Sequence, residues 1–148
     1  MNKRLMLDSR SLRLVYATGH VHDALTRHVS RMLIERGWAF ATPSRLRFLS
    51  ELECGVNYAS EIARRLDLSR QVVAKTVAEM SRLGVLQVEQ DQQRGNQNLI
   101  RFTERGERLM ADAREVLAAL DATLGDEDGL DSLLGMLTEL QLRLADEG

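Results

Sequence analysis

The chain of 148 residues contains a single cysteine and a single proline, and aromatic residues make up only 4% of it. One cysteine excludes an internal disulfide and suits a reducing compartment. The scarcity of proline, together with many Leu, Ala, Arg and Glu residues, predicts a mostly helical protein. Because 44% of the residues are apolar, the chain can bury a core and is not expected to be disordered.

The sequence also lacks the segments that direct a protein to or across a membrane. No apolar run approaches the roughly 20 residues that a membrane span needs. The N-terminal segment contains two basic residues, Lys3 and Arg4, but no apolar segment long enough for a secretory signal follows them. We therefore expect a cytoplasmic protein with no membrane partner.

Motifs that carry catalysis are missing as well. The sequence has no Gly-rich phosphate loop and no nucleophile motif. His20, His22 and His28 are separated by two, six and eight residues, whereas metal ligands on one helix face are three or four residues apart. These absences predict that the protein is not an enzyme and that it uses no metal and no cofactor.

Charge is unevenly distributed along the chain. Residues 1–50 contain nine Lys and Arg against three acids (+6), residues 51–100 six against seven (−1), and residues 101–148 five against twelve (−7). A chain polarised in this way can present one basic surface to a polyanion. The alternative is that these charges only solvate the outer faces of helices.

Hydrophobic periodicity and capping residues predict the order of the elements. Apolar residues at helical spacing lie between Ser or Thr caps and terminating glycines, and from Val85 the pattern becomes apolar and β-branched. In chain order we expect a helix over 9–36, a helix from Thr42 to Gly55, a short helix capped by Asn57, a helix from Ser69 to Gly84, a β-hairpin over 85–103, a helix over 104–124 capped by Thr103, and a helix over 130–145.

The stretch DLSRQVVAKTVAEMSRLGVL, residues 67–86, has two different faces. Val73, Val77 and Met80 fall on one side of the predicted helix. The opposite side holds basic and small residues, which are Arg70, Gln71, Ala74, Lys75 and Ala78. Such a face is narrow and cationic, and helix faces of this kind suit contact with a polyanion.

Two short helices followed at once by a hairpin predict a winged helix-turn-helix, whose second helix lies in the major groove of DNA. Arg70 and Lys75 could then reach phosphates or guanine, and Gln71 could pair with adenine. The alternative is a helical pair inside an all-α core with a solvated face. The hairpin directly after Gly84 favours the winged motif.

Over nearly its whole length the chain resembles the MarR (multiple antibiotic resistance regulator) family. The resemblance is carried by the long first helix and by the stretches TPSRLRFLSEL, SEIARRLDLSRQVV, EMSRLGVL and LIRFTERG. The last stretch matches the family pattern Leu-Val-x-Leu-Thr-x-x-Gly at Leu99, Ile100, Phe102, Thr103 and Gly106.

The resemblance implies a mainly α fold with a small β-hairpin wing and a dimeric architecture. Residues 1–36 would form an N-terminal dimerisation helix, residues 37–103 a winged helix-turn-helix domain, and residues 104–148 the C-terminal dimerisation helices. The homodimer would bind pseudo-palindromic double-stranded DNA as a transcriptional regulator, expected to be a repressor. The expected DNA-binding residues are Ser69, Arg70, Gln71, Ala74, Lys75, Arg94 and Asn96.

Many members of the family release DNA when they bind a small, often aromatic, effector. His22 falls in the apolar seam between Val15 and Val29, where it could be a hydrogen-bonded core residue or part of an effector pocket. Tyr16 and Trp38 could line the same pocket or could serve only in packing. These three residues are the candidates for effector binding.

Two positions depart from the family pattern. The wing usually carries Asp-x-Arg ahead of the Leu-Val step, where this chain has Arg94, Gly95 and Asn96. In the recognition helix, Val72 and Ala74 replace residues that often bear hydroxyl groups. The departures favour an alternative, a degenerate winged-helix protein that docks a protein partner, as an antirepressor does, and binds DNA weakly.

Cys54 raises a further alternative, a thiol-based redox sensor. A sensing thiol is exposed and lies near cations or a helix N-terminus. Cys54 follows a predicted helix C-terminus and stands beside Glu51 and Glu53, which would disfavour the thiolate. We therefore expect a passive thiol that is buried or half-buried, with the sensor as the alternative.

Overall fold

The structure is a computed structural model that describes residues 9–95, 97–125 and 127–147. The chain divides into two compact units, one ending at Ala113 and the other beginning at Arg114. Within the described residues, no helix combines the length and apolar character that a membrane span requires.

The first helix is α2, Arg10–Glu35, and it begins at the predicted cap. The Ser9 hydroxyl accepts a hydrogen bond from the Leu12 amide at 3.2 Å, which satisfies one of the amides left free at a helix start. The chain then leaves the helix at Gly37, whose φ of +99° suits a residue without a side chain. The predicted start and end of this helix are confirmed.

The second helix, α3, covers Pro43–Ser50 and is shorter than predicted. Pro43 at its start has no amide hydrogen to leave unsatisfied. The helix was expected to continue to Gly55, but residues 51–56 form turns and irregular structure. These residues lead into a short strand instead.

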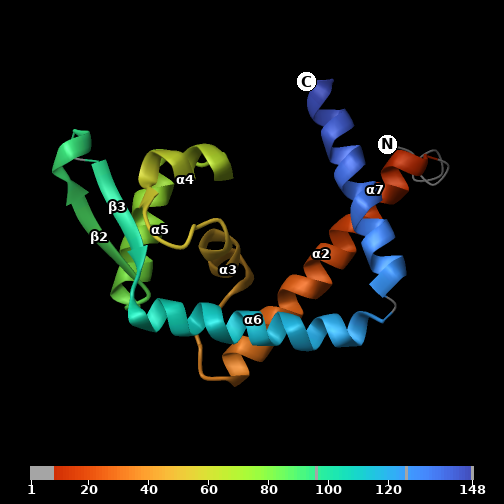
Figure 1. Ribbon diagram of the computed structural model, residues 1–148, viewed down its shortest axis with the longest axis horizontal. Helices are drawn as coiled ribbons and strands as arrows, with labels where there is room; N and C mark the ends of the chain where they lie inside the picture. Colours follow the sequence, from red (N-terminus) through yellow and green to blue (C-terminus); the bar gives the residue numbers. More distant parts are fainter. Residues whose placement is uncertain (1–8, 96, 126, 148) are drawn as a thin grey trace. The chain divides into compact units, whose positions relative to one another are not determined.

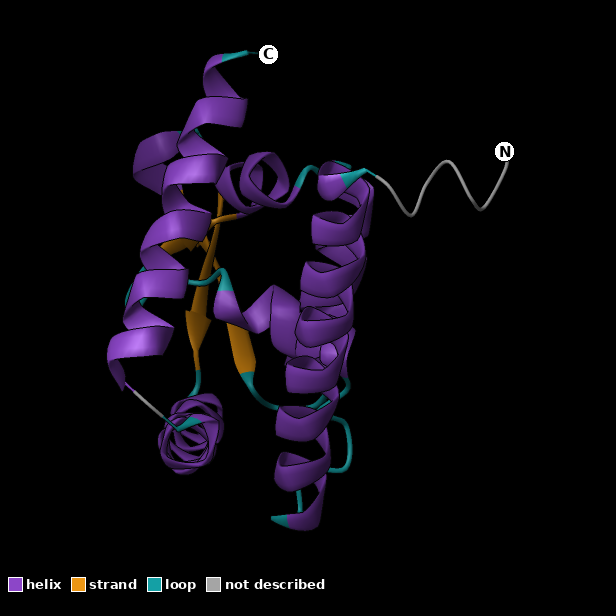
Figure 2. Cartoon of the chain, turned by 90° about the vertical axis from the view of Figure 1, so that its right-hand side faces the viewer, coloured by secondary structure: helices purple, strands orange, loops and turns teal. Residues whose placement is uncertain are grey.

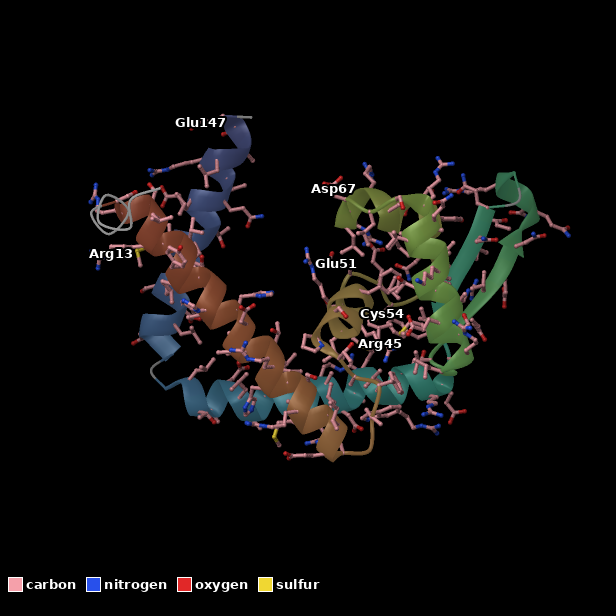
Figure 3. All side chains as sticks on the ribbon, turned by 180° about the vertical axis from the view of Figure 1, so that it is seen from behind. Arg13, Arg45, Glu51, Cys54, Asp67 and Glu147 are labelled. Atoms are coloured by element: carbon pink, nitrogen blue, oxygen red, sulfur yellow. The ribbon has the colours of Figure 1, made fainter. Side chains whose placement is uncertain are left out.

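Helices α4, Ala59–Leu66, and α5, Arg70–Arg82, form the helix-turn-helix. Asp67 takes the left-handed conformation at the end of α4 with φ 51°, and Figure 3 labels it at this turn. The Ser69 hydroxyl then caps α5 by accepting from the Val72 amide at 3.2 Å. Figure 1 shows α4 and α5 joined through this turn, with α3 beside them.

The prediction that Asn57 caps α4 is wrong. Asn57 lies in strand β1, Asn57–Tyr58, and Tyr58 directly precedes the helix without a capping side-chain bond. The Asn57 side chain is 1% exposed and binds backbone elsewhere: its Oδ1 accepts from the Glu53 amide at 2.7 Å, and its Nδ2 donates to the Glu53 carbonyl at 2.9 Å. A buried amide with these partners cannot also serve a helix end.

The predicted hairpin is confirmed as β2, Leu86–Asp91, and β3, Gln97–Phe102. The two strands pair with each other in the antiparallel direction. Strand β1 pairs antiparallel with the other edge of β3, so that the order in the sheet is β1-β3-β2. Figure 2 shows the two long strands of this sheet in orange, lying side by side. The sequence did not predict β1, because its two residues pair with a segment more than 40 residues later.

The core of the first unit gathers apolar side chains from α2 to α6 and from the sheet. Val73, Val77 and Met80 on the inner face of α5 are at most 5% exposed, as their spacing predicted. The other buried members include Leu33, Phe48, Leu49, Ile62, Val85, Leu86, Ile100 and Leu109.

Helix α6, Glu104–Leu124, starts at a joint with the end of α5. The Thr103 hydroxyl donates to the Gly84 carbonyl at 2.5 Å and accepts from the Gly106 amide at 3.0 Å. Thr103 therefore caps α6, as predicted, and also fixes the helix to the turn after α5. The last helix, α7, covers Glu127–Asp146 and begins slightly before the predicted residue 130.

Candidate nucleic-acid interface

The outer face of α5 is exposed as the sequence predicted. Arg70, Gln71, Ala74 and Lys75 all lie on the surface, opposite the buried face of the same helix. Among the described residues, no hydrogen bond or ion pair engages the side chains of Arg70 or Lys75. Two cations near the N-terminal half of the helix are thus available to an external anion.

Ser69 has two possible roles at the start of this face. Its hydroxyl oxygen accepts from the Val72 amide, so the cap uses one of its lone pairs. A serine hydroxyl also carries one hydrogen to donate. The residue can therefore cap α5 and still donate that hydrogen to an external oxygen.

The tip of the wing is held by a group of three side chains, Tyr58, Asp91 and Arg94, which we call the wing cluster. The Tyr58 hydroxyl donates to Asp91 Oδ2 at 3.1 Å, and the Arg94 guanidinium carbon lies 4.9 Å from the centre of the Tyr58 ring. Asp91 Oδ1 accepts from the Gln93 amide at 3.0 Å. Desolvation, reinforced by the hydrogen bond to Asp91, raises the pKa of Tyr58 above its ordinary value.

The wing tip itself is a short 3-10 turn, η1, Gln92–Arg94. Gly95 follows it in the left-handed conformation with φ 65°, which reverses the chain toward β3. Arg94, expected to reach DNA, lies at the exposed end of this turn. Asn96, the other wing residue expected to bind DNA, lies outside the described residues.

Val72 lies on a different flank of α5 from the basic residues. Its side chain, 44% exposed, lines a cavity of about 600 Å³ together with Leu68, Phe48 and Thr76. On the rim of this cavity Arg45, labelled in Figure 3, forms an ion pair with Glu79 and donates to the Phe40 carbonyl at 3.1 Å. The valine therefore contributes to the flank that faces α3.

The three candidate effector residues do not form one site within a single chain. Tyr16 and His22 are exposed on α2, where the Tyr16 ring stacks on His20 with centroids 6.2 Å apart. Trp38 follows the far end of α2. At 1.5 Å per helical residue, the length of α2 separates Trp38 from Tyr16 by roughly 30 Å and from His22 by roughly 20 Å.

Trp38 instead connects the end of α2 with α6. Its Nε1 donates to Asp112 Oδ2 at 2.6 Å, and Arg36 lies 3.7 Å from the other oxygen of this carboxylate. The Arg105 guanidinium lies 5.6 Å from the Trp38 ring centre. Arg108 completes the lining of a hollow of about 300 Å³ beside these residues.

Cys54 is exposed, so the expectation of a buried or half-buried thiol is wrong. It lies in the loop between α3 and β1, where Figure 3 labels it. The neighbouring Glu53 is engaged: its backbone binds the Asn57 side chain, and its carboxylate lies 3.3 Å from Arg65. The bonded backbone of Glu53 fixes the loop just before the cysteine.

Tyr58 is the residue of this surface that the sequence did not reveal. Its contacts with Asp91 and Arg94 depend on the pairing of β1 with β3. A strand of two residues is too short to be predicted from a local sequence pattern. The only local sign was an aromatic residue immediately before the first helix of the motif.

No protein-family model matches this chain, and no curated protein matches it. Solved structures do. The MarR family transcriptional regulator Sco5413 from Streptomyces coelicolor is 23% identical, with a TM-score of 0.67 over 92% of this chain and 96% of its own. The organohalide-sensing regulator RdhR-CbdbA1625, solved with 2,4-dichlorophenol bound, is 20% identical, with a TM-score of 0.73 over 97% and 85%.

A third structure, overoxidized AbfR bound to DNA, is 19% identical and has a TM-score of 0.64 over 90% of this chain and 93% of its own. The three matches therefore extend over nearly the whole chain. At sequence identities of 19–23%, these matches establish the fold of the chain. The chain has the winged-helix fold of the MarR-type transcriptional regulators.

Proposed function

We propose that this protein is a DNA-binding transcriptional regulator in which α5 enters the major groove and the wing contacts the neighbouring backbone or minor groove. The observation that carries the proposal is the outer face of α5, where Arg70 and Lys75 are exposed and have no partner among the described residues. Small Ala74 between them lets the helix approach the bases closely. Gln71 is placed to read a base edge.

The similarity to AbfR supports this reading, since that regulator was solved on DNA with the same fold. Cations on both the helix and the wing would neutralise phosphates at two places along the duplex. Here Arg94 supplies the wing cation. Ser69 adds a hydroxyl donor at the start of α5, where phosphate oxygens commonly bind.

We propose that the active form is a homodimer joined through residues 1–36 and 104–148, with residues 37–103 as the DNA-binding domain. The support is apolar surface that one chain leaves uncovered. Large exposed apolar residues on α7 are Leu133, Leu134, Met136, Leu142 and Leu144, and α2 exposes Leu14, Val15 and Val21. Exposed apolar surface of this extent on two helices is typical of an interaction site. Two copies would place their α5 helices about one DNA turn apart on a pseudo-palindrome.

We further propose that the dimer acts as a repressor and that a small effector releases it from DNA. The support is the similarity to RdhR-CbdbA1625, which was solved with 2,4-dichlorophenol. In this chain Tyr16, His22 and Trp38 remain the proposed contacts. Because Trp38 is far from Tyr16 and His22 in one chain, the site would require both copies of α2.

A thiol-controlled form of the same function has one observation in its favour, the exposure of Cys54. An oxidant in solution could reach this sulfur directly. The Cys54→Ser variant tests it: peroxide would release the wild type from DNA but leave the variant bound. Equal release of both proteins would contradict it.

Selection of bound duplexes from a random pool, followed by gel-shift assays in low salt, tests the main proposal. We expect enrichment of a pseudo-palindrome with half-sites one helical turn apart. The variant Arg70→Ala/Lys75→Ala should lose most of this binding, whereas Arg101→Ala, which removes an exposed cation of β3 opposite Gln87, away from α5 and from the wing tip, should keep it. A wild-type chain that retains no duplex even in low salt would favour the protein-docking alternative and overturn the proposal.

A further inference from the structure

Tyr58 joins the start of α4 to the wing tip, two parts of the molecule that are remote in sequence. We propose that Tyr58 is a positioning residue that holds Arg94 in place for contact with DNA, an inference that rests on the proposed function. The interaction runs entirely within the first unit and involves only described residues.

The register of the sheet explains how Tyr58 reaches the wing. Tyr58 pairs with Leu99 on β3, and Leu99 pairs with Glu89 on β2, so these residues form one row across the sheet. Asp91 is two residues beyond Glu89 and therefore lies on the same face. The Tyr58 side chain crosses over β3 along this face to meet Asp91 at the end of β2.

The wing cluster holds both ends of the tip turn at once. Asp91 precedes η1, and its carboxylate uses one oxygen to cap the turn and the other to accept the Tyr58 hydroxyl. Arg94 is the last residue of η1, and its guanidinium lies over the Tyr58 ring. A single side chain thus fixes the beginning of the turn through its hydroxyl and the end through its aromatic face.

This arrangement leaves Arg94 able to bind a further anion. A guanidinium that packs on an aromatic ring uses its flat face and keeps its N–H donors at the edge. Within the described residues, no hydrogen bond or ion pair occupies those donors. Arg94 can therefore donate to a phosphate or a base while it stays on the ring, and it has already lost part of the rotamer freedom that binding would cost.

A double-mutant cycle on the selected duplex tests the proposal. Fluorescence anisotropy would compare Tyr58→Leu, Arg94→Ala and the two substitutions together. We expect each single variant to bind about tenfold more weakly per dimer, because two copies of the contact are lost. The double variant should bind no more weakly than Arg94→Ala alone, since Tyr58 acts through Arg94.

Two further variants separate positioning from folding. Tyr58→Phe keeps the ring under Arg94 but removes the bond to Asp91, so it should bind DNA better than Tyr58→Leu. Gln87→Ala, on the same face of β2 but near its base, is the matched control and should bind as the wild type does. Hydrogen exchange of the Gln93 amide in the free protein should quicken in Tyr58→Leu and not in Gln87→Ala.

The outcomes distinguish this proposal from the function on which it rests. Unchanged affinity in Tyr58→Leu, or losses that add in the double variant, would overturn the role of Tyr58 while the wild type still bound DNA. Absence of binding by the wild type would overturn the function itself. In that case the exchange of Gln93 would still report whether Tyr58 orders the wing.

Discussion

Gly106 lies so close to the carbonyl oxygen of Val85 that a Cβ atom at position 106 would come within 2.1 Å of it. The approach brings the first turn of α6 against the residue that follows α5. Thr103 makes the same joint from the other side, through its bonds to Gly84 and Gly106. The Thr-x-x-Gly pattern of the sequence therefore has a physical cause. The backbone of residue 106 approaches the Val85 carbonyl so closely that no residue with a Cβ atom fits there.

Replacement of this glycine should be costly for that reason. Gly106→Ala is expected to lower the free energy of unfolding by about 3 kcal/mol or more, because a backbone oxygen cannot move away as a flexible side chain can. Urea denaturation followed by circular dichroism measures the change. Gly19→Ala is the control, since a Cβ at that helical position meets nothing within 4 Å, and it should stabilise α2 by about 0.5–1 kcal/mol. Equal stabilities of the two variants would contradict the argument.

Elements whose signals are local were predictable from the sequence. Ser9, Ser69 and Thr103 each cap the helix that follows them, and the capping bond spans only three residues. Asn57 has an equally good local signal for a helix cap, but it lies in β1 and caps no helix. Its side chain is bound to Glu53 and to the Ile100 carbonyl on β3, and tertiary partners of this kind leave no periodic trace in a sequence.

Asn57 should accordingly be important for stability although it caps no helix. Asn57→Ala would leave the Glu53 amide without its partner and a small gap in the core, and we expect a loss of about 2 kcal/mol in the free energy of unfolding. Asn98→Ala, at an exposed position of β3, should change it by less than about 0.5 kcal/mol. Chemical denaturation of both variants checks the difference, and a loss at Asn98 as large as that at Asn57 would refute it.

In the candidate interface, too, the features with local signals were predictable and those that depend on tertiary contacts were not. Helical periodicity identified the outer face of α5, because one buried row fixes the direction of every other residue on a helix. It could not show that Arg94 rests on Tyr58, since that contact depends on strand pairing between residues 58 and 99. The sequence predicted a buried or half-buried Cys54 because it placed this residue near the end of a helix. In the structure α3 ends at Ser50, and Cys54 lies in an irregular loop, where helical periodicity does not determine which side chains are buried.

The raised pKa of Tyr58 predicts a pH dependence at the alkaline end. The pKa of Tyr58 in the folded protein lies above its ordinary value of 10.0, chiefly through desolvation and then through the hydrogen bond to Asp91. Its contribution to stability is therefore complete below pH 10 and is lost as the pH rises through the folded pKa. Compared with Tyr58→Phe, the wild type should lose more stability between pH 9 and pH 12.

Asp91→Asn offers an independent measurement of the same bond. The substitution removes the negative charge and leaves at most a neutral amide oxygen as acceptor, which forms a weaker hydrogen bond, so the pKa of Tyr58 should fall toward its ordinary value. Absorbance of tyrosinate during an alkaline titration reports this pKa. If Tyr58 ionised identically in the wild type and in the Asp91→Asn variant, its hydroxyl would not use this partner in solution.

Lys75 should contribute to DNA binding through charge, and salt provides the readout. Each lysine that neutralises a phosphate releases condensed counterions, so Lys75→Ala should weaken binding and reduce the slope of log affinity against log salt by about one for each copy in contact. The loss should be similar on specific and random duplexes, because a phosphate contact carries no sequence information.

Gln71→Ala should have the opposite effects on these two quantities. It should leave the salt slope unchanged and reduce only the preference for the selected site over random duplex. Anisotropy titrations between 50 and 200 mM salt separate the two behaviours. A Lys75→Ala variant with the wild-type slope would place this lysine outside the contact and would leave Arg70 as the only basic side chain of the outer face of α5 able to make it.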